Sequence, residues 1–116
     1  MEAIYKLNVD CGRNGDLYGV FIAQKEHVKA LVEKEIEVYF GEVLGKHSEI
    51  SGALDNKMLE MVSSDPNDVA VVRRLRLEHG HNPLEYACSQ GQAKEYGLEG
   101  YDNTVLDLIE HILAPK

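Results

Sequence analysis

The sequence is poor in cysteine, poor in basic residues relative to acids, and without a long apolar run. Its two cysteines, Cys11 and Cys88, have no CxxC or other paired spacing, which excludes a disulfide framework and favours a reducing compartment. No run approaches the roughly 20 apolar residues of a membrane span, and residues 1–6 lack the basic and apolar regions of a secretory leader. We therefore expect a cytoplasmic protein that does not enter a membrane.

The shortage of basic residues also bears on which kinds of partner the protein can bind. Lys and Arg number 12 against 20 acids, giving a formal net charge of −8. Direct nucleic-acid binding is disfavoured, because such affinity depends largely on neutralising phosphates. An acidic protein can instead bind a basic protein surface, although the same charge is common for solubility alone.

The overall composition predicts one folded domain. Hydrophobic residues make up 44% of the chain and charged residues 28%, a balance typical of globular proteins and not of disordered ones. We expect residues 1–116 to form a single α+β domain, with an antiparallel sheet of about five strands and three or four helices packed on it.

The domain is predicted to open with a β-hairpin. Residues 5–9 alternate between apolar and polar types, and Asn14-Gly15 then supplies a strong hairpin signal, because both residues accept positive φ. Residues 17–23 form the second predicted strand, with apolar residues on both faces. Further strands are predicted over residues 36–40, 50–54 and 58–62, as a meander joined to the hairpin.

Four segments carry helical signals. Residues 25–34 have amphipathic spacing. Asp65 and Pro66 start a second predicted helix that ends near Gly80, and a short helix is predicted over residues 82–90. Residues 91–100 have three glycines and predict an irregular connection. A last helix is predicted after Asp102 or Asn103.

The loop 41–48 is the best candidate binding site. It lies between two predicted strands and contains Glu42, Lys46, His47 and Ser48, and Glu49 follows it directly, so five chemically active side chains come together here. It is not a P-loop, because only three residues separate its glycines and a strand follows instead of a helix. Lys46, His47 and Ser48 could still bind an anionic group with help from glycine-exposed amides. The alternative is a solvated polar turn.

His79, His81 and Cys88 form a weaker candidate site. His81 and Cys88 flank Glu85 at spacings compatible with one face of a helix, and all three residue types bind zinc. No HExxH or paired CxxC motif supports a metal, and histidines near a helix end are also favourable against the helix dipole. We expect no cofactor.

Two other features bear on function. Arg73, Arg74 and Arg76 are the densest basic group; they could recognise carboxylate or phosphate, or simply pair with neighbouring surface acids. From Glu78 onward seven acids face two lysines, so this half could dock on a basic partner.

Nucleophilic catalysis has little support in the sequence. Arg13 near Cys11 could lower the pKa of the thiol, but no positioned base can be assigned.

The segment VYFGEVLGKHSE at residues 38–49 resembles a segment of short uncharacterised proteins of bacteria and their phages. Residues 7–15 and 82–86 are similar to the same group, so the resemblance covers most of residues 1–90. It implies a bacterial or viral accessory protein and transfers no catalytic residue. Some small acidic proteins of that kind inhibit host or defence machinery, which is the expectation by analogy.

These observations together favour a binding protein over an enzyme. We expect it to act through a protein surface or an anionic small ligand at the loop 41–48, and an edge strand or the last helix could mediate a homodimer. The alternative is a small enzyme or metalloprotein that uses the loop 41–48 or the group His79, His81 and Cys88.

Overall fold

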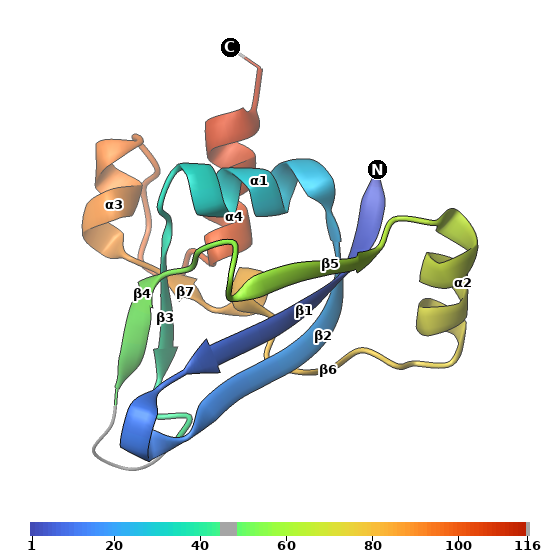
Figure 1. The fold of residues 1–116 in the computed structure, drawn as a ribbon. Coiled ribbons are helices and arrows are strands. Elements are labelled where there is room, and N and C mark those ends of the chain that lie inside the picture. Colours follow the sequence, from blue (N-terminus) through green and yellow to red (C-terminus); the bar gives the residue numbers. More distant parts are fainter. Residues whose placement is uncertain (45–48, 116) are drawn as a thin grey trace.

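The computed structural model describes residues 1–44 and 49–115, and over them the fold is α+β with two antiparallel sheets (Figure 1). The four-stranded sheet has the order β5-β1-β2-β6 and the three-stranded sheet the order β4-β3-β7. The strands are β1 (Glu2–Asp10), β2 (Asp16–Gln24), β3 (Glu37–Gly41), β4 (Ile50–Ala53), β5 (Leu59–Ser63), β6 (His79–Gly80) and β7 (Ala87–Cys88). The α-helices are α1 (Lys25–Glu33), α2 (Pro66–Arg74), α3 (Gln90–Glu95) and α4 (Val105–Leu113).

The opening hairpin is confirmed. β1 and β2 pair antiparallel in unbroken register from Glu2↔Gln24 to Asp10↔Asp16. A 3-10 turn, η1 (Gly12–Asn14), joins them, and Gly15 follows at φ 104°, a backbone angle that suits glycine.

The two faces of this hairpin are covered by different helices. Tyr5 and Leu7 point into the main core, as their alternation predicts. On the other face Ile4 and Ile22 are also buried, because Val69 of α2 packs against them in a second, small cluster. Both faces of the hairpin are therefore buried at the end that α2 covers. Nearer the turn, Tyr18 of β2 is 42% exposed.

The prediction of one five-stranded sheet does not describe this arrangement. β3 pairs with β4 as expected, but β5 pairs with β1 instead of continuing the meander from β4. β3 completes its own sheet with β7, which lies within the segment 82–90 that was predicted to be helical. Alternation shows which residues face a core, but it does not show which strand is the neighbour.

Helix α2 is shorter than predicted. Asp65 caps it as expected, its carboxylate accepting from the amide of Asn67 at 2.8 Å. The helix ends at Arg74 instead of near Gly80, because Arg76 adopts a left-handed conformation at φ 54°. Gly80 lies in β6, where an added Cβ would come within 2.3 Å of the carbonyl oxygen of Tyr18.

The C-terminal third also departs from the prediction. The segment 82–90 contains a 3-10 turn, η2 (Pro83–Glu85), followed by β7, and α3 occupies part of the predicted irregular stretch 91–100. The last helix is confirmed, but its cap is Thr104, which forms a capping box with Asp107.

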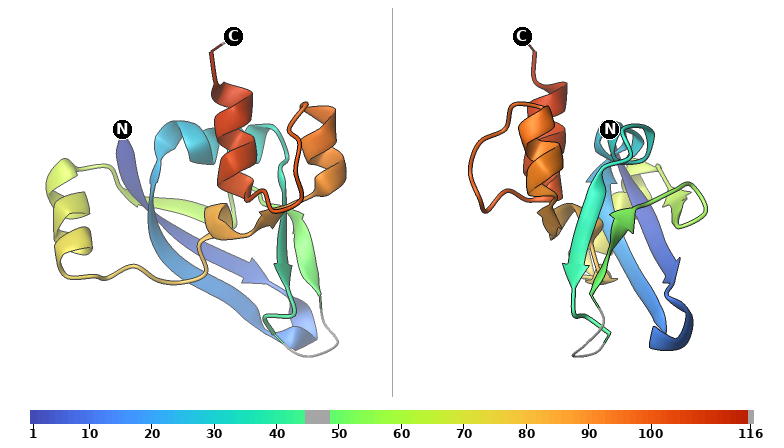
Figure 2. Two further views of the ribbon diagram at one scale, coloured as in Figure 1. Left: turned by 180° about the vertical axis from the view of Figure 1, so that it is seen from behind. Right: turned by 90° about the vertical axis from the view of Figure 1, so that its left-hand side faces the viewer.

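The core joins both sheets to two helices. α1 and α4 contact one another, and Leu31, Leu108 and Ile109 are fully buried in the cluster that also contains Val38 and Leu7. The three-stranded sheet and α3 lie at one end of the molecule and α2 at the other (Figure 2). In the described part of the chain, no helix combines the length and the apolar character needed to cross a membrane.

Candidate functional site

The predicted loop site is only partly described. Glu42 directly follows β3 and Glu49 directly precedes β4, and both side chains are exposed. Lys46, His47 and Ser48 lie outside the described residues. The described part of the predicted site is therefore a pair of carboxylates next to the ends of two paired strands.

The outward face of the three-stranded sheet supplies the neighbours of these carboxylates. Val38 and Phe40 of β3 point into the core, so Glu37 and Tyr39 point outward. Tyr39 is 43% exposed, and its cross-strand partners are Ser51 on one side and Ala87 on the other. Because both partners are small, the tyrosine stands uncovered in the middle of the sheet face.

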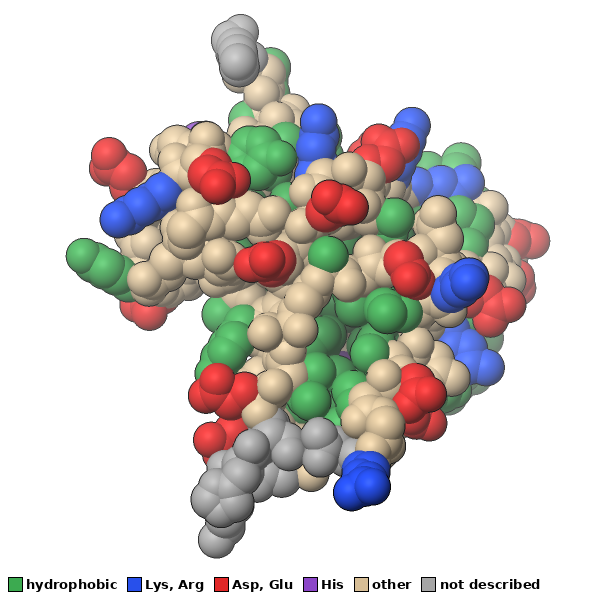
Figure 3. Space-filling model, turned by 60° about the vertical axis from the view of Figure 1, so that its left-hand side comes forward, with side chains coloured by type: hydrophobic (Ala, Val, Ile, Leu, Met, Phe, Trp, Pro, Cys, Tyr) green, Lys and Arg blue, Asp and Glu red, His purple; other side chains and the backbone are tan. Residues whose placement is uncertain are grey.

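A cavity of about 450 Å³ opens on this face. Glu37, Tyr39 and Ser51 line it from the sheet, and Gln90 and Tyr101 line it from the C-terminal segment. A second cavity of about 360 Å³ shares Gln90 and Tyr101 and extends along α3. Tyr101 is 85% exposed, so its ring is available to a ligand from either cavity. Figure 3 turns this side of the molecule forward and shows acidic and hydrophobic side chains next to one another.

The wall of the cavity is fixed by a single amide side chain. Gln92 of α3 accepts from the amide of Glu37 at 2.8 Å and donates to the carbonyl of Glu35 at 3.0 Å. These two bonds hold α3 against the first residue of β3. The sequence contains no motif for this contact, because its two ends are more than fifty residues apart.

The electrostatics around Tyr39 are negative. A hydrogen bond to Glu49, followed by the charge of that carboxylate, raises the pKa of Tyr39, with smaller contributions from desolvation and Glu42. The phenol therefore stays protonated near neutral pH and can donate a hydrogen bond. The carboxylates of Glu37, Glu42 and Glu49 suit a cationic ligand better than an anionic one.

The group His79, His81 and Cys88 is not brought together as a metal site. His79 stacks on Tyr18 on the outer face of the four-stranded sheet, with ring centroids 5.6 Å apart. His81 is hydrogen-bonded to the hydroxyl of Tyr86, and Cys88 is buried in the main core. Among residues 1–44 and 49–115, no three His, Cys, Asp or Glu side chains converge on a point that could hold a metal ion.

The two thiols are not activated. Burial is the largest cause that raises the pKa of Cys88. Burial and the charges of Asp10 and Asp16 raise the pKa of Cys11, which corrects the expectation that Arg13 would lower it. Neither cysteine has the electropositive surroundings of a catalytic thiolate.

The three arginines have separate environments. Arg73 hydrogen-bonds both carboxylate oxygens of Glu2 through its two terminal nitrogens. Arg74 is the last residue of α2 and Arg76 lies beyond its end, so Arg73 and Arg76 do not lie on one helical face. Within the described ranges, neither Arg74 nor Arg76 forms an ion pair.

Comparisons with protein-family models, with curated proteins and with solved structures find no significant match to this chain. Its function must therefore be argued from its own geometry.

Proposed function

We propose that this protein is a binding protein that captures Arg or Lys side chains of a partner protein on the outward face of the three-stranded sheet. We call this surface the tyrosine–carboxylate face and define it by Glu37, Tyr39, Glu42, Glu49, Ser51 and Tyr101. The observation that carries the proposal is one cavity lined by the exposed rings of Tyr39 and Tyr101 and by Glu37, with the carboxylate of Glu49 hydrogen-bonded to Tyr39.

Tyrosine and carboxylate groups recognise cations by complementary means. An aromatic face attracts a guanidinium or ammonium group and contributes about 0.5–2 kcal/mol, depending on exposure. Carboxylates add charge and accept the donors that these groups carry, and bidentate pairing favours Arg over Lys. A partner residue that entered between Tyr39 and Tyr101 would meet both kinds of contact.

The overall charge supports the same kind of partner. With a net charge of −8, the whole molecule attracts a basic surface before any contact forms, which raises the association rate. The described carboxylates favour this partner over an anionic small ligand, the expectation based on Lys46 and His47.

A catalytic role receives no comparable support. The ionisable groups of the cavity whose pKa is shifted are Tyr39 and Cys88, and both shifts favour the protonated form. A protonated phenol and thiol serve better as hydrogen-bond donors than as bases or nucleophiles.

The resemblance of residues 38–49 to short bacterial and phage proteins extends the proposal to the partner's identity. We propose a host or defence protein with a basic surface, which the tyrosine–carboxylate face would mask. Many proteins that bind nucleic acid carry such a surface.

Calorimetric titration with two short synthetic peptides tests this function. One peptide alternates arginine with glycine, and the other has glutamate in place of arginine. We expect the arginine peptide to bind and the glutamate peptide to give no binding signal. Tyr39→Ala, Tyr101→Ala and the double variant Glu37→Gln/Glu49→Gln should each weaken binding about tenfold, since tenfold corresponds to about 1.4 kcal/mol.

Matched controls separate a site from general charge attraction. Glu60→Gln/Glu110→Gln removes the same charge from exposed positions outside the face, and Tyr96→Ala removes a tyrosine that lines neither cavity described above. Both should bind the arginine peptide as the unmodified protein does. Equal losses in the controls and the site variants would show that only net charge attracts the peptide, and the proposal would fail.

A further inference from the structure

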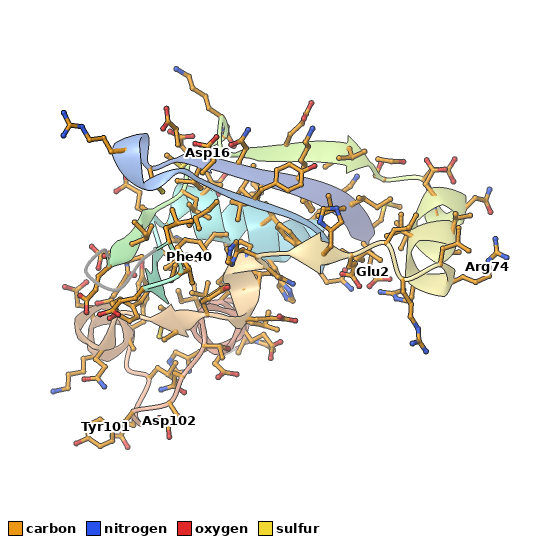
Figure 4. The ribbon with its side chains drawn as sticks, turned by 90° about the horizontal axis from the view of Figure 1, so that it is seen from below. Glu2, Asp16, Phe40, Arg74, Tyr101 and Asp102 are labelled. Carbon is orange, nitrogen blue, oxygen red and sulfur yellow. The ribbon has the colours of Figure 1, made fainter. Side chains whose placement is uncertain are left out.

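A second surface, at the opposite end of the molecule, combines exposed aliphatic side chains with two arginines. It consists of Val71, Arg74, Leu75, Arg76 and Leu77, and we call it the α2 surface. Figure 4 shows that Arg74 and Tyr101 lie at opposite ends of the structure. The α2 surface is therefore separate from the tyrosine–carboxylate face, and nothing in its argument depends on the function proposed above.

The α2 surface exposes aliphatic side chains that the fold does not use. Helix α2 packs on the four-stranded sheet through Val69, which is buried, with Val72 beside it. Val71, Leu75 and Leu77 remain 39%, 54% and 49% exposed. These three large aliphatic side chains lie within seven residues of chain, and exposed apolar side chains that gather in one region are typical of protein interfaces.

The acids around this patch are already engaged, and two of the arginines are not. Glu2 binds Arg73, the hydroxyl of Ser63 donates to Asp68 at 2.6 Å, and Glu78 accepts from the amide of Ile22 at 2.8 Å. In the part of the chain that the structure describes, Arg74 and Arg76 have no acidic partner within ion-pair distance. The patch therefore presents two arginines that are outside any ion pair among the described residues.

The end of α2 is held in one conformation. The amide of Leu77 donates to the carbonyl of Val72 at 2.9 Å, and the amide of Arg76 donates to that of Arg73 at 3.3 Å. These are the two bonds of a Schellman motif, in which Arg76 holds the left-handed position that glycine occupies most easily. A surface fixed in this way loses little conformational entropy when a partner binds.

We propose that the α2 surface binds an acidic amphipathic segment of a partner protein. Val71, Leu75 and Leu77 would contact the apolar side of that segment, and Arg74 and Arg76 would pair with carboxylates beside it. Charge complementarity determines this choice, because a basic segment would meet the two free arginines. A nucleic acid fits less well, because three aliphatic side chains offer phosphates neither a charge nor a hydrogen-bond donor. The net charge of −8 also repels the phosphate backbone.

Two synthetic helical peptides with the same leucine pattern test the proposal. One carries glutamate beside the leucines and the other carries lysine, and binding to the full chain is measured by fluorescence anisotropy. We expect the glutamate peptide to bind at least tenfold more tightly than the lysine peptide. The variant Arg74→Glu/Arg76→Glu should reverse this preference.

Two further variants keep the result interpretable. Arg13→Glu/Lys57→Glu changes the net charge equally at exposed positions away from α2 and should leave the preference unchanged. Arg76→Gly removes one charge while relieving the left-handed backbone, so it should fold at least as well and still bind the glutamate peptide several-fold more weakly.

Three results would overturn the proposal: equal affinity for both peptides, an equal effect of the Arg13/Lys57 control, or binding of the glutamate peptide that is unchanged in Arg76→Gly. A short DNA duplex is titrated in parallel. If it binds with an affinity that Arg74→Glu/Arg76→Glu abolishes, and neither peptide binds, the surface belongs to a nucleic acid and not to a protein segment.

Discussion

The two sheets of this protein use similar polar residues in different ways. On the four-stranded sheet and α2, Glu2 is tied to Arg73 and Glu78 is tied to the amide of Ile22. On the three-stranded sheet, Glu37 and Tyr39 point outward into a cavity, and Tyr39 has small residues on both sides. Glu2 and Glu78 therefore hold the fold together, whereas the side chain of Glu37 lines a cavity and remains available to a ligand.

This comparison predicts where a substitution affects stability and where it affects binding. A substitution of a residue that the fold uses should lower stability, whereas a matched substitution of a residue that the fold does not use should leave stability nearly unchanged.

Phe40→Ala should cause the largest change. Phe40 is 5% exposed and its ring lies 4.8 Å from that of Tyr86, so truncation should lower the free energy of unfolding by about 3–5 kcal/mol. Its neighbour Tyr39 points to the other side, and Tyr39→Ala should stay within about 0.5 kcal/mol of the unmodified protein. Urea denaturation measures both, and a comparable loss in Tyr39→Ala would contradict the division between the two faces.

Gly19→Ala should destabilise the four-stranded sheet by about 1–3 kcal/mol. An added Cβ at this position would lie 2.1 Å from the carbonyl oxygen of His81, which is backbone and cannot rotate away. Gly91→Ala is the control, because it lies on exposed helix α3 with no atom nearer than 3.8 Å, and it should be neutral or stabilising. Thermal unfolding of both variants measures the difference. Unchanged stability in Gly19→Ala would mean that β6 is free to move away from β2.

The smallest effect concerns the ion pair of Glu2 and Arg73. The hydrogen bond from Arg73 is the largest cause that lowers the pKa of Glu2 below its ordinary value. A lowered folded-state pKa contributes stability above the ordinary value of about 4.3 and loses it as the pH falls through the lowered value. Because Glu2 is 37% exposed, the contribution should be only about 0–1 kcal/mol.

Glu2→Gln should therefore be slightly less stable than the unmodified protein at neutral pH and equally stable in acid. Denaturant unfolding at several pH values measures the difference, with Glu110→Gln as an exposed control. A difference between Glu2→Gln and the unmodified protein that grows as the pH falls would contradict the assigned sign.

Several elements could be predicted because their signals are local. Asn14-Gly15 marked the opening turn, Asp65 and Pro66 marked the start of α2, and the spacing of Val28, Leu31 and Val32 marked α1. Each of these signals acts within about one turn of chain, so the same residues produce the same structure in many surroundings.

Other elements could not be predicted because they depend on distant partners. β6 and β7 are two residues long and have no periodicity of their own; they are strands only because β2 and β3 offer free edges. The end of α2 could not be predicted because Leu75 and Leu77 continue the apolar pattern of the helix although both side chains remain exposed. In the sequence, an apolar residue that stays exposed on the surface has the same spacing as one that is buried in the core.

The sequence by itself determined the hairpin, the first and last helices, the Asp65 cap of α2 and the net negative charge, because these follow from neighbouring residues and from composition. The tertiary structure alone decided that β5 joins β1, that β7 joins β3, and that Gln92 fixes α3 beside Glu37. The last two of these contacts lie beside the cavity that Tyr39 and Tyr101 share. The physical reason is that strand pairing and burial depend on contacts between segments that are far apart in the sequence. The surfaces that remain exposed are those that no such contact covers.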